Sequence, residues 1–274
     1  MWKDNLLIGK EIIMQVITSK DNEIVKNIKK LKEKKYRDAE GQYIVEGIKL
    51  VKEAIEEKAK IKKIVLCEDC ENDGTIEKSL MYEIAKYDCI YVSAKVFSIL
   101  TDVEKPQGIL AVIEKNTAEN ISYSEDIIVV LDGIQDPGNL GTILRTVDSV
   151  GLKQIILSEK TADPYNPKVV RSTMGAIFRV NIIQSKNVLN TLKEIKKNKY
   201  KLLATSLDTD KSLYNIELNK KAIIIGNEAN GVSKEVFEMV DEKMIIPMLG
   251  KTESLNAAVA TGVVLYEYVR RKIK

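Results

Sequence analysis

Residues 127–157 read IIVVLDGIQDPGNLGTILRTVDSVGLKQIIL, and this stretch decides the fold. The apolar run 127–131 has the length of a strand, and residues 140–150 repeat apolar side chains at helical spacing. A second short apolar run follows at 154–157. Strands separated by helical stretches are typical of α/β layer structures, in which helices cover a largely parallel sheet. We therefore predict an α/β fold.

The same alternation continues on both sides of this stretch. Towards the C-terminus we expect helices at 168–174, 188–197 and 255–272, and strands at 178–183, 201–206, 222–225 and 243–247. Towards the N-terminus we expect a basic amphipathic helix at 21–37, further helices at 48–59, 76–86 and 94–100, and strands at 43–45, 61–66, 90–92 and 109–113.

A polar stretch divides the chain. Residues 115–125 lack strong periodicity, which is typical of a linker. This pattern predicts a smaller N-terminal α/β domain at 19–114 and a C-terminal α/β domain at 126–274. Residues 1–18 would form an N-terminal extension, and Met14 is a candidate translation start because the segment before it fits neither domain.

Composition excludes several classes of site. The 274 residues include no histidine, which rules out Ser-His-Asp triads, HExxH zinc sites and two-histidine iron sites. Lys and Arg number 43 against 40 Asp and Glu, a formal net charge of +3. That charge is too small to indicate nucleic-acid binding by the whole surface. Any basic footprint must be local.

Cellular location and metal binding follow from the apolar runs and the cysteines. No apolar run approaches the ~20 residues of a membrane-spanning helix, and we see no secretory signal. Three cysteines suit reduced thiols, so we expect a cytoplasmic protein that does not bind a membrane. A zinc site on Cys67, Cys70 and Cys89 would need an acidic fourth ligand from 69–73. Buried thiols at strand ends are the favoured alternative, and we expect no metal.

Three polar, glycine-containing loops follow predicted strands in the C-terminal half: DPGNLGTILR at 136–145, IGNEANGV at 225–232 and IIPMLGKTESLNAA at 245–258. Open α/β sheets bind ligands at such positions. The first loop is neither a GxGxxG fingerprint nor a Walker A loop. Taken singly, each loop also fits turn chemistry with a helix cap, from Asn139 in the first loop and Ser254 in the third.

Together the loops carry a family resemblance. The motifs NxGxxxR, IIGNEANGVS and IPMxGxxESLNxAxA, in this order, resemble the SpoU (TrmH) branch of the SPOUT class of RNA ribose methyltransferases. Residues 163–176 are also similar to this family. In the N-terminal half, KYR at 35–37 followed by YIVEG at 43–47 resembles the RNA substrate-binding domain that many of these enzymes carry.

The resemblance implies a fold, a cofactor and an assembly. The C-terminal domain would be a SPOUT domain with a deep trefoil knot, S-adenosylmethionine would bind in the knotted cleft, and a homodimer would complete each active site. Cofactor contacts, mostly through the backbone, would fall on Thr205, Gly226, Asn227, Ile246, Pro247, Met248, Leu255 and Ala257.

The resemblance also assigns catalysis to Arg145, with Asn139, Glu228, Ser254 and Asn256 in the site. A guanidinium stays protonated and is a poor general base. We therefore expect Arg145 to bind the phosphate beside the target ribose and to orient the 2′-hydroxyl. Glu228 could act in catalysis or serve only to hold a loop amide.

The substrate implied is structured RNA. Phosphate contacts are expected from Arg171 and, on the basic helix, from Lys29, Lys30, Lys34, Lys35 and Arg37. The N-terminal domain favours ribosomal RNA over transfer RNA. A transfer-RNA ribose methyltransferase, a base-methylating SPOUT enzyme and a non-catalytic RNA-binding or ribosome-assembly protein on the same fold are the alternatives.

Overall fold

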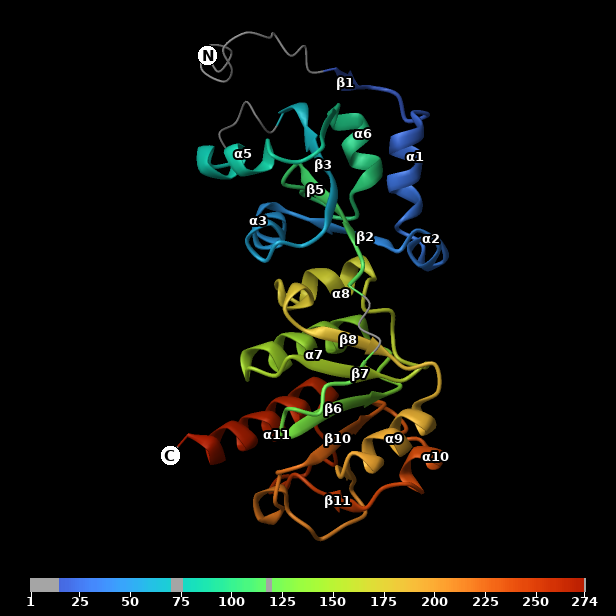
Figure 1. Cartoon of the computed structure of the whole chain (residues 1–274), viewed down its shortest axis with the longest axis vertical. Helices are drawn as coiled ribbons and strands as arrows, with labels where there is room; N and C mark the ends of the chain where they lie inside the picture. Colours follow the sequence, from blue (N-terminus) through green and yellow to red (C-terminus); the bar gives the residue numbers. More distant parts are fainter. Residues whose placement is uncertain (1–14, 70–75, 117–119, 274) are drawn as a thin grey trace.

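Two β-sheets, one above the other in Figure 1, organise the chain. The computed structural model describes residues 15–69, 76–116 and 120–273. The first sheet has the strand order β1-β4-β3-β5-β2, and the second has the order β11-β9-β10-β6-β7-β8. Each sheet is covered by helices, which confirms the predicted α/β class. The knot stays a prediction.

The first sheet contains β1 (Val16–Ile17), β2 (Gln42–Glu46), β3 (Ile61–Cys67), β4 (Cys89–Val92) and β5 (Ile109–Glu114). Its helices are α1 (Glu23–Lys30), α2 (Lys34–Glu40), α3 (Ile48–Glu56), α5 (Lys78–Ile84) and α6 (Ala94–Leu100).

This sheet departs from the largely parallel arrangement that we expected. Strand β5 runs antiparallel to both β2 and β3, whereas β3 and β1 pair with β4 in parallel. The reason is the loop 101–108, which returns the chain to the edge where β3 ends, so that Cys67 N donates to Gly108 O over 2.8 Å. Strand β5 therefore starts at that edge and runs back.

The second sheet contains β6 (Ile127–Asp132), β7 (Gln154–Leu157), β8 (Asn181–Gln184), β9 (Lys201–Thr205), β10 (Lys221–Gly226) and β11 (Glu242–Met244), all paired in parallel. Its helices are α7 (Pro137–Ser149), α8 (Pro167–Ser172), α9 (Val188–Lys197), α10 (Lys234–Phe237) and α11 (Ala257–Lys272).

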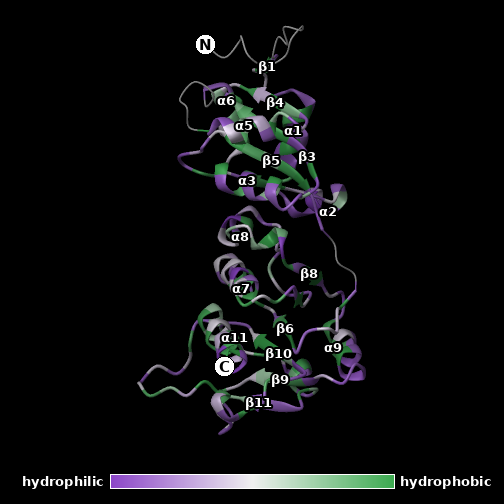
Figure 2. Ribbon diagram, turned by 60° about the vertical axis from the view of Figure 1, so that its left-hand side comes forward, coloured by the Kyte–Doolittle hydropathy of each residue, from purple (hydrophilic) through white to green (hydrophobic). Residues whose placement is uncertain are grey.

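The continuous apolar run of β6 follows from burial on both faces. Ile127, Val129 and Leu131 pack in one cluster with residues of α7 and α11, while Ile128 and Val130 pack in another with residues of α9. Figure 1 shows α7 and α11 on one side of this sheet and α9 and α10 on the other. In Figure 2 the apolar colour concentrates in the strands, with hydrophilic residues on the outer helices.

The predicted basic helix at 21–37 is wrong as a single element. Helix α1 ends at Lys30 and α2 begins at Lys34. The Arg37 Nη1 donates to Leu31 O over 2.9 Å and to Lys32 O over 2.6 Å. These carbonyls would accept the next bonds of a continuous helix, so the arginine replaces those bonds and stabilises the break.

Two further strands are shorter than expected. Strand β8 starts at Asn181 because residues 176–178 form a 3₁₀ turn, and β11 ends at Met244. The described residues of the predicted linker contact the C-terminal part of the chain, since Tyr200 Oη donates to Tyr123 O over 3.0 Å and Ser122 N donates to Gln154 Oε1 over 2.9 Å. We call the first sheet with its helices the first layer and the second sheet with its helices the second layer. The described part of the linker therefore lies against the second layer.

Buried contacts join the two layers. Arg37 pairs with Asp163 at 2.5 Å, and the rings of Tyr43 and Tyr165 lie 4.8 Å apart. Arg179 Nη1 lies 3.1 Å from Glu53 of α3. A single apolar cluster contains core residues from both sheets. The N-terminal half is thus packed onto the C-terminal half.

Several expectations from the sequence concern residues that lie outside the described ranges. Met1 and Met14 lie outside them, as do Cys70 and residues 71–75 of the zinc alternative. Among the described residues no group of His, Cys, Asp and Glu could hold a metal ion. Cys67 is buried and Cys89 is half-buried, with burial raising the pKa of the Cys89 thiol to about 11. No helix in the described part of the chain is long and apolar enough to cross a membrane.

Candidate active site

A cavity of about 340 Å³ opens at the carboxyl ends of three adjacent parallel strands, β9, β10 and β11. Open parallel sheets bind ligands at this edge. The cavity is lined by Thr205, Ser206, Leu207, Ile225, Gly226, Asn227, Glu228, Ala229, Gly231, Met244, Ile245, Ile246, Met248, Glu253, Ser254, Leu255, Ala257 and Ala260. Two of the three loops singled out from the sequence therefore meet here.

Most of the residues expected to bind a cofactor line this cavity. They are Thr205, Gly226, Asn227, Ile246, Met248, Leu255 and Ala257. Pro247 is the exception, since it is exposed and is not among the lining residues.

Gly226 has a steric role in this cavity. A Cβ at position 226 would lie 2.2 Å from the backbone of Gly231 and Val232. The loop that follows β10 therefore folds directly over Gly226. It is closed by Asn227 N donating to Gly231 O over 2.8 Å and Gly231 N donating to Asn227 O over 2.9 Å. Only glycine allows this close approach, which shapes one wall of the cavity.

Three polar side chains from three separate loops form a hydrogen-bonded chain beside the cavity. Asn256 Nδ2 donates to Asn139 Oδ1 over 2.9 Å, and Asn139 Nδ2 donates to Glu228 Oε1 over 2.8 Å. The first of the three loops thus joins the other two through Asn139. Because Glu228 accepts from the amide of Asn139, it orients that amide and can hold a hydroxyl-bearing ligand in one position.

The helix caps differ from those expected. Asp136 caps α7 by accepting from Asn139 N over 2.7 Å. The Asn139 side chain is therefore not needed as a cap and can bond Glu228 and Asn256. Asn256, not Ser254, caps α11, with Oδ1 accepting from Ala258 N over 2.9 Å. The sequence did carry a signal for Asp136, because it directly precedes a proline at the first helical position.

The glycine of the NxGxxxR motif is a packing residue. Helices α7 and α8 cross at Gly141, where a Cβ would lie 2.3 Å from Ser172 Cβ and 2.9 Å from Val169 O. Any side chain at position 141 would push the helices apart. The arginine of the same motif lies one helical turn further along α7.

Arg145 does not line the cavity of its own chain. Its side chain is exposed, and within the described residues it forms no hydrogen bond or ion pair. Ser254 does line the cavity and is exposed to solvent. The structure therefore brings Asn139, Glu228, Ser254 and Asn256 to one edge of the sheet and leaves Arg145 on the outer surface.

The four lysines expected to bind RNA are exposed on α1 and α2. Lys34 pairs with Asp38, and Lys35 lies 3.3 Å from Glu33 and 4.6 Å from the centre of the Tyr36 ring. Lys29 and Lys30 form no ion pair with a described residue. This corner presents cations together with one aromatic ring.

Arg37 is a correction to the expected RNA contacts. Its side chain is 2% exposed, and Nη2 and Nε both donate to Asp163 Oδ2, over 2.5 Å and 3.1 Å. All of its polar contacts are to the protein itself. Arg37 therefore joins the two layers and is not available to an RNA phosphate.

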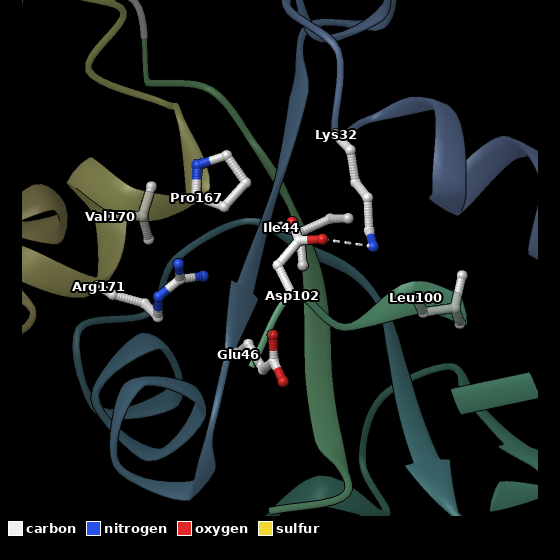
Figure 3. A pocket seen from close by; sticks show the side chains of 8 residues that line it. All are labelled: Lys32, Ile44, Glu46, Leu100, Asp102, Pro167, Val170 and Arg171. Carbon is white, nitrogen blue, oxygen red and sulfur yellow. Dashed lines mark hydrogen bonds and ion pairs between the residues drawn. The ribbon is translucent and has the colours of Figure 1, made fainter. Parts of the chain in front are cut away.

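Arg171 lies between the two layers, in a small cavity shown in Figure 3. Lys32 enters from the other side, with Glu46 and Asp102 between the two cations. Burial raises the pKa of Glu46, and the nearby Arg171 opposes that rise. The Arg171 side chain forms no hydrogen bond with a described residue, so its guanidinium keeps donors free at this junction.

Comparison with known proteins gives two family matches. Residues 126–266 match the SpoU rRNA methylase family, and residues 22–111 match the MRM3-like substrate-binding domain. The chain is 33% identical to the 23S rRNA (guanosine(2553)-2′-O)-methyltransferase RlmP of Bacillus subtilis, over 92% of this chain and 98% of that protein. An uncharacterized tRNA/rRNA methyltransferase of Synechocystis is 30% identical over 93% of this chain and 94% of its own length.

Solved structures agree. An AdoMet-bound rRNA methyltransferase from Sinorhizobium meliloti has a TM-score of 0.83 and 31% identity, covering 95% of this chain and 99% of that one. A putative TrmH-family RNA methyltransferase from Porphyromonas gingivalis has a TM-score of 0.79 and 31% identity, covering 90% and 97%. With a family match over half its length and relatives aligned almost from end to end, the chain belongs to the SpoU rRNA methylase family.

Proposed function

We propose that this protein transfers a methyl group from S-adenosylmethionine to a ribose 2′-hydroxyl of ribosomal RNA. The observation that carries the proposal is the Asn256–Asn139–Glu228 chain at the rim of the cavity. It places polar groups from three loops where a ribose could lie beside a bound cofactor. The related Bacillus subtilis enzyme is named for 23S rRNA, which favours ribosomal over transfer RNA as the substrate.

The cavity suits the proposed cofactor. Its volume of about 340 Å³ lies within the ~300–1,000 Å³ of small-molecule sites. Ile225, Ile246 and Leu255 provide apolar walls for an adenine ring, and the backbone of 226–231 provides N–H and C=O groups at the edge. S-adenosylmethionine, when bound, supplies a methyl group on a sulfonium leaving group, so the protein needs mainly to position the acceptor hydroxyl.

We assign roles to the polar residues on this basis. Asn139 and Asn256 would hold the ribose, with Glu228 fixing the amide of Asn139, and Ser254 would close the cavity mouth. Arg145 would bind the phosphate next to the target ribose and orient the 2′-hydroxyl, because its guanidinium stays charged and offers two parallel donors. Proton removal would be shared with that phosphate.

A second copy of the chain would complete the site. Arg145 lies on α7 outside its own cavity, and the adjacent helix α11 exposes Val259 and Tyr266, which are 52% and 54% accessible. Tyr266 Oη contacts Ser149 Oγ of α7 over 3.3 Å, so the two helices share this face. We infer a homodimer in which the face is covered and Arg145 of one protomer reaches the cavity of its partner.

The N-terminal half would bind the RNA. Residues 19–114 are assigned to substrate binding, with Lys29, Lys30, Lys34 and Lys35 as phosphate contacts and Arg171 as a contact at the junction. Residues 115–125 join this part to the methyltransferase part at 126–274. Binding through such contacts should weaken steeply as salt rises. A cytoplasmic location belongs to the same proposal.

The reaction can be tested by transfer of a labelled methyl group to unmodified ribosomal and transfer RNA, read by alkaline hydrolysis, because 2′-O-methylation blocks cleavage of the modified linkage. We expect one protected position in ribosomal RNA. We also expect Arg145→Lys to lose most of the rate while cofactor affinity stays the same, since the charge remains and the bidentate geometry is lost. Methylation of transfer RNA alone would identify a different substrate, and no incorporation with no cofactor binding would indicate a non-catalytic scaffold.

The shared site can be tested by mixing two inactive variants. Arg145→Ala keeps the cavity intact, and Leu255→Arg fills the cavity but keeps Arg145. In a mixed dimer, one site then combines an intact cavity with an intact arginine only if Arg145 acts across the interface. We expect mixing to restore about a quarter of wild-type activity from random pairing of the protomers, because half of the dimers are mixed and each has one good site of two. No recovery from folded, dimeric variants would show that Arg145 acts within its own chain.

A further inference from the structure

Arg179 contacts both layers of the molecule at once. It directly follows the 3₁₀ turn 176–178, and its Nη1 lies 3.1 Å from Glu53 Oε2 in α3 and 3.4 Å from Glu57 Oε1 just after that helix. Its Nε donates to Asp148 Oδ2 of α7 over 2.9 Å. The side chains of Glu53 and Asp148 are only 18% and 20% exposed, so these bonds are partly shielded from water. One guanidinium therefore ties α3 of the first layer to α7 of the second.

The backbone four residues before Arg179 is shaped to receive Glu53. Gly175 has a φ of +90°, and a Cβ at this position would lie 1.4 Å from Glu53 Oε2. Met174 also has a positive φ, of 50°, which is uncommon for a residue other than glycine. Two consecutive residues in the left-handed region thus open a notch that the Glu53 carboxylate fills. An incidental surface ion pair needs no such backbone, so this contact is a built feature of the junction.

A second contact between the layers lies at the opposite side of the junction. There Arg37 of α2 pairs with Asp163, and the rings of Tyr43 and Tyr165 lie 4.8 Å apart. Figure 1 shows α2 and α3 on opposite sides of the first layer, where it meets α8. Two separated contacts fix the angle between two packed units, whereas one contact leaves a hinge. Without the Arg179 contact, the first layer could rock about the Arg37 side and stay attached.

The two helices that Arg179 ties belong to different parts of the proposed RNA path. Asp148 is three residues from Arg145 on α7, so the two are neighbours on the helix surface. Arg145 is the proposed phosphate contact beside the target ribose, and the exposed lysines of α1 and α2 are the proposed contacts in the first layer. Because methyl transfer needs the 2′-hydroxyl aligned with the methyl donor, an RNA held in both layers requires a fixed angle between them.

We propose that Arg179 is a positioning residue for methyl transfer: it holds the first layer at a fixed angle to α7, so that RNA bound by the first layer meets Arg145 in register. The inference rests on the proposed function, because it needs RNA contacts in both layers. Arg179 itself does not touch the RNA in this proposal, since its Nε and Nη1 donate to carboxylates of the protein. The three carboxylates around it would also repel a phosphate.

The test is single-turnover methyl transfer at saturating cofactor and increasing RNA concentration, which measures RNA affinity and the rate at saturation separately. Arg179→Met keeps the apolar stem and removes the charge. We expect its saturating rate to fall about 10- to 100-fold, because the RNA is bound but out of register. RNA affinity should stay close to wild type, since the proposed phosphate contacts are kept. Cofactor affinity should not change, because neither Arg179 nor its three partners line the cofactor cavity.

Two further variants make the comparison specific. Gly175→Ala breaks the same contact by another route, because the new Cβ takes the place of the Glu53 carboxylate while Arg179 is kept. It should show the same slow rate with near wild-type RNA affinity. Lys196→Met is the matched control: Lys196 lies 2.7 Å from Asp241, with side chains 39% and 31% exposed, so it removes an ion pair within the second layer alone. Its rate and RNA affinity should match wild type.

Other roles for Arg179 give different results. A merely structural role would lower the folded fraction, which reduces the amount of product formed in the first turnover but leaves its rate constant unchanged. A direct phosphate contact would weaken RNA binding and reduce its salt dependence. Glu53→Gln separates the last case as well. It should slow methyl transfer if Glu53 and Arg179 act together, and it should tighten RNA binding if it releases Arg179 for a phosphate.

Failure of this inference can be told apart from failure of the proposed function. The inference is overturned if Arg179→Met keeps the wild-type rate constant at saturating RNA, or if it loses RNA affinity instead of rate. An equal loss of rate in Lys196→Met would overturn it too, because any lost ion pair would then have the same effect. No methyl incorporation into any RNA by the wild-type protein would instead reject the proposed function, and the inference with it.

Discussion

Replacing Arg37 with methionine should destabilise the fold rather than weaken RNA binding. In the sequence, Arg37 stands among the lysines of a basic stretch, but in the structure its side chain is 2% exposed. Four hydrogen bonds hold it: two to Asp163 Oδ2 and one each to the carbonyls of Leu31 and Lys32. The Asp163 side chain is itself only 8% exposed.

The size of the stability loss follows from the polar groups that Arg37→Met leaves without a partner. Methionine keeps most of the apolar stem but leaves the Asp163 carboxylate buried without its cation, and two carbonyls lose a donor. Removing one partner of a buried ion pair costs about 3–5 kcal/mol. At about 2–4 °C per kcal/mol for chains of this size class, the melting temperature should fall by roughly 6–20 °C.

Urea unfolding and RNA affinity should be measured together for four proteins. These are wild type, Arg37→Met, the double variant Arg37→Met with Asp163→Leu, and Lys29→Met as the matched control. The double variant should lose less stability than Arg37→Met alone, because no unpaired charge remains buried. Lys29→Met should unfold like wild type and lower RNA affinity. The reasoning is refuted if Arg37→Met keeps wild-type stability while losing RNA affinity with a smaller salt dependence, which is the behaviour of a phosphate contact.

Two further predictions concern packing and pH. Gly141→Ala should lower the free energy of unfolding, measured in urea, by about 1–3 kcal/mol and reduce methyl transfer, because a Cβ 2.3 Å from Ser172 Cβ must separate α7 from α8. Thr142→Ala, on the exposed side of α7, is the control and should change stability little. Equal losses of stability in both variants would contradict the packing argument. The buried Glu267 carboxylate accepts from two arginines, which lower its pKa to about 2, below the value near 4.5 expected when unfolded. Its stabilisation is therefore present above about pH 4.5 and is lost as the pH falls towards 2. Glu267→Gln should unfold at lower urea than wild type at pH 7, with the gap closing on acidification, and a gap that does not change with pH would exclude this carboxylate as its source.

The local pattern of apolar and polar residues was sufficient to predict most helices and strands of the fold. The run Ile127–Leu131 has apolar residues at every position because both faces of β6 are covered, and this pattern is visible in the sequence. The direction of β5 was not predictable in the same way, because it depends on where the loop 101–108 returns the chain. The break between α1 and α2 depends on Arg37, whose bonding partners lie on a different turn and in a different layer.

The candidate site shows the same division. The three loops were predicted to follow strands, where open α/β sheets bind ligands, and the family resemblance grouped them into one site. The cavity and the Asn256–Asn139–Glu228 chain bring them together. What the motifs do not reveal is which of their residues serve the fold. Asn139 and Asn256 are both near helix starts, but Asp136 caps α7 and so releases Asn139, while Asn256 caps its helix and also contacts Asn139. That distinction needs the bonding partners.

The difference between residues that serve the fold and residues that do not helps to distinguish an enzyme from a non-catalytic scaffold with the same fold. Asp136, Gly141 and Gly226 are required wherever the fold is kept, because they cap α7, allow α7 and α8 to cross and let the loop close over β10. Glu228 is different, since its side chain is exposed and forms one hydrogen bond within the described part of the chain, to Asn139. A scaffold would gain little stability from it, as removing an exposed hydrogen bond between side chains costs about 1 kcal/mol or less. Glu228, together with the exposed Arg145, which has no side-chain partner among the described residues, therefore fits the proposed substrate role better than a role in the fold.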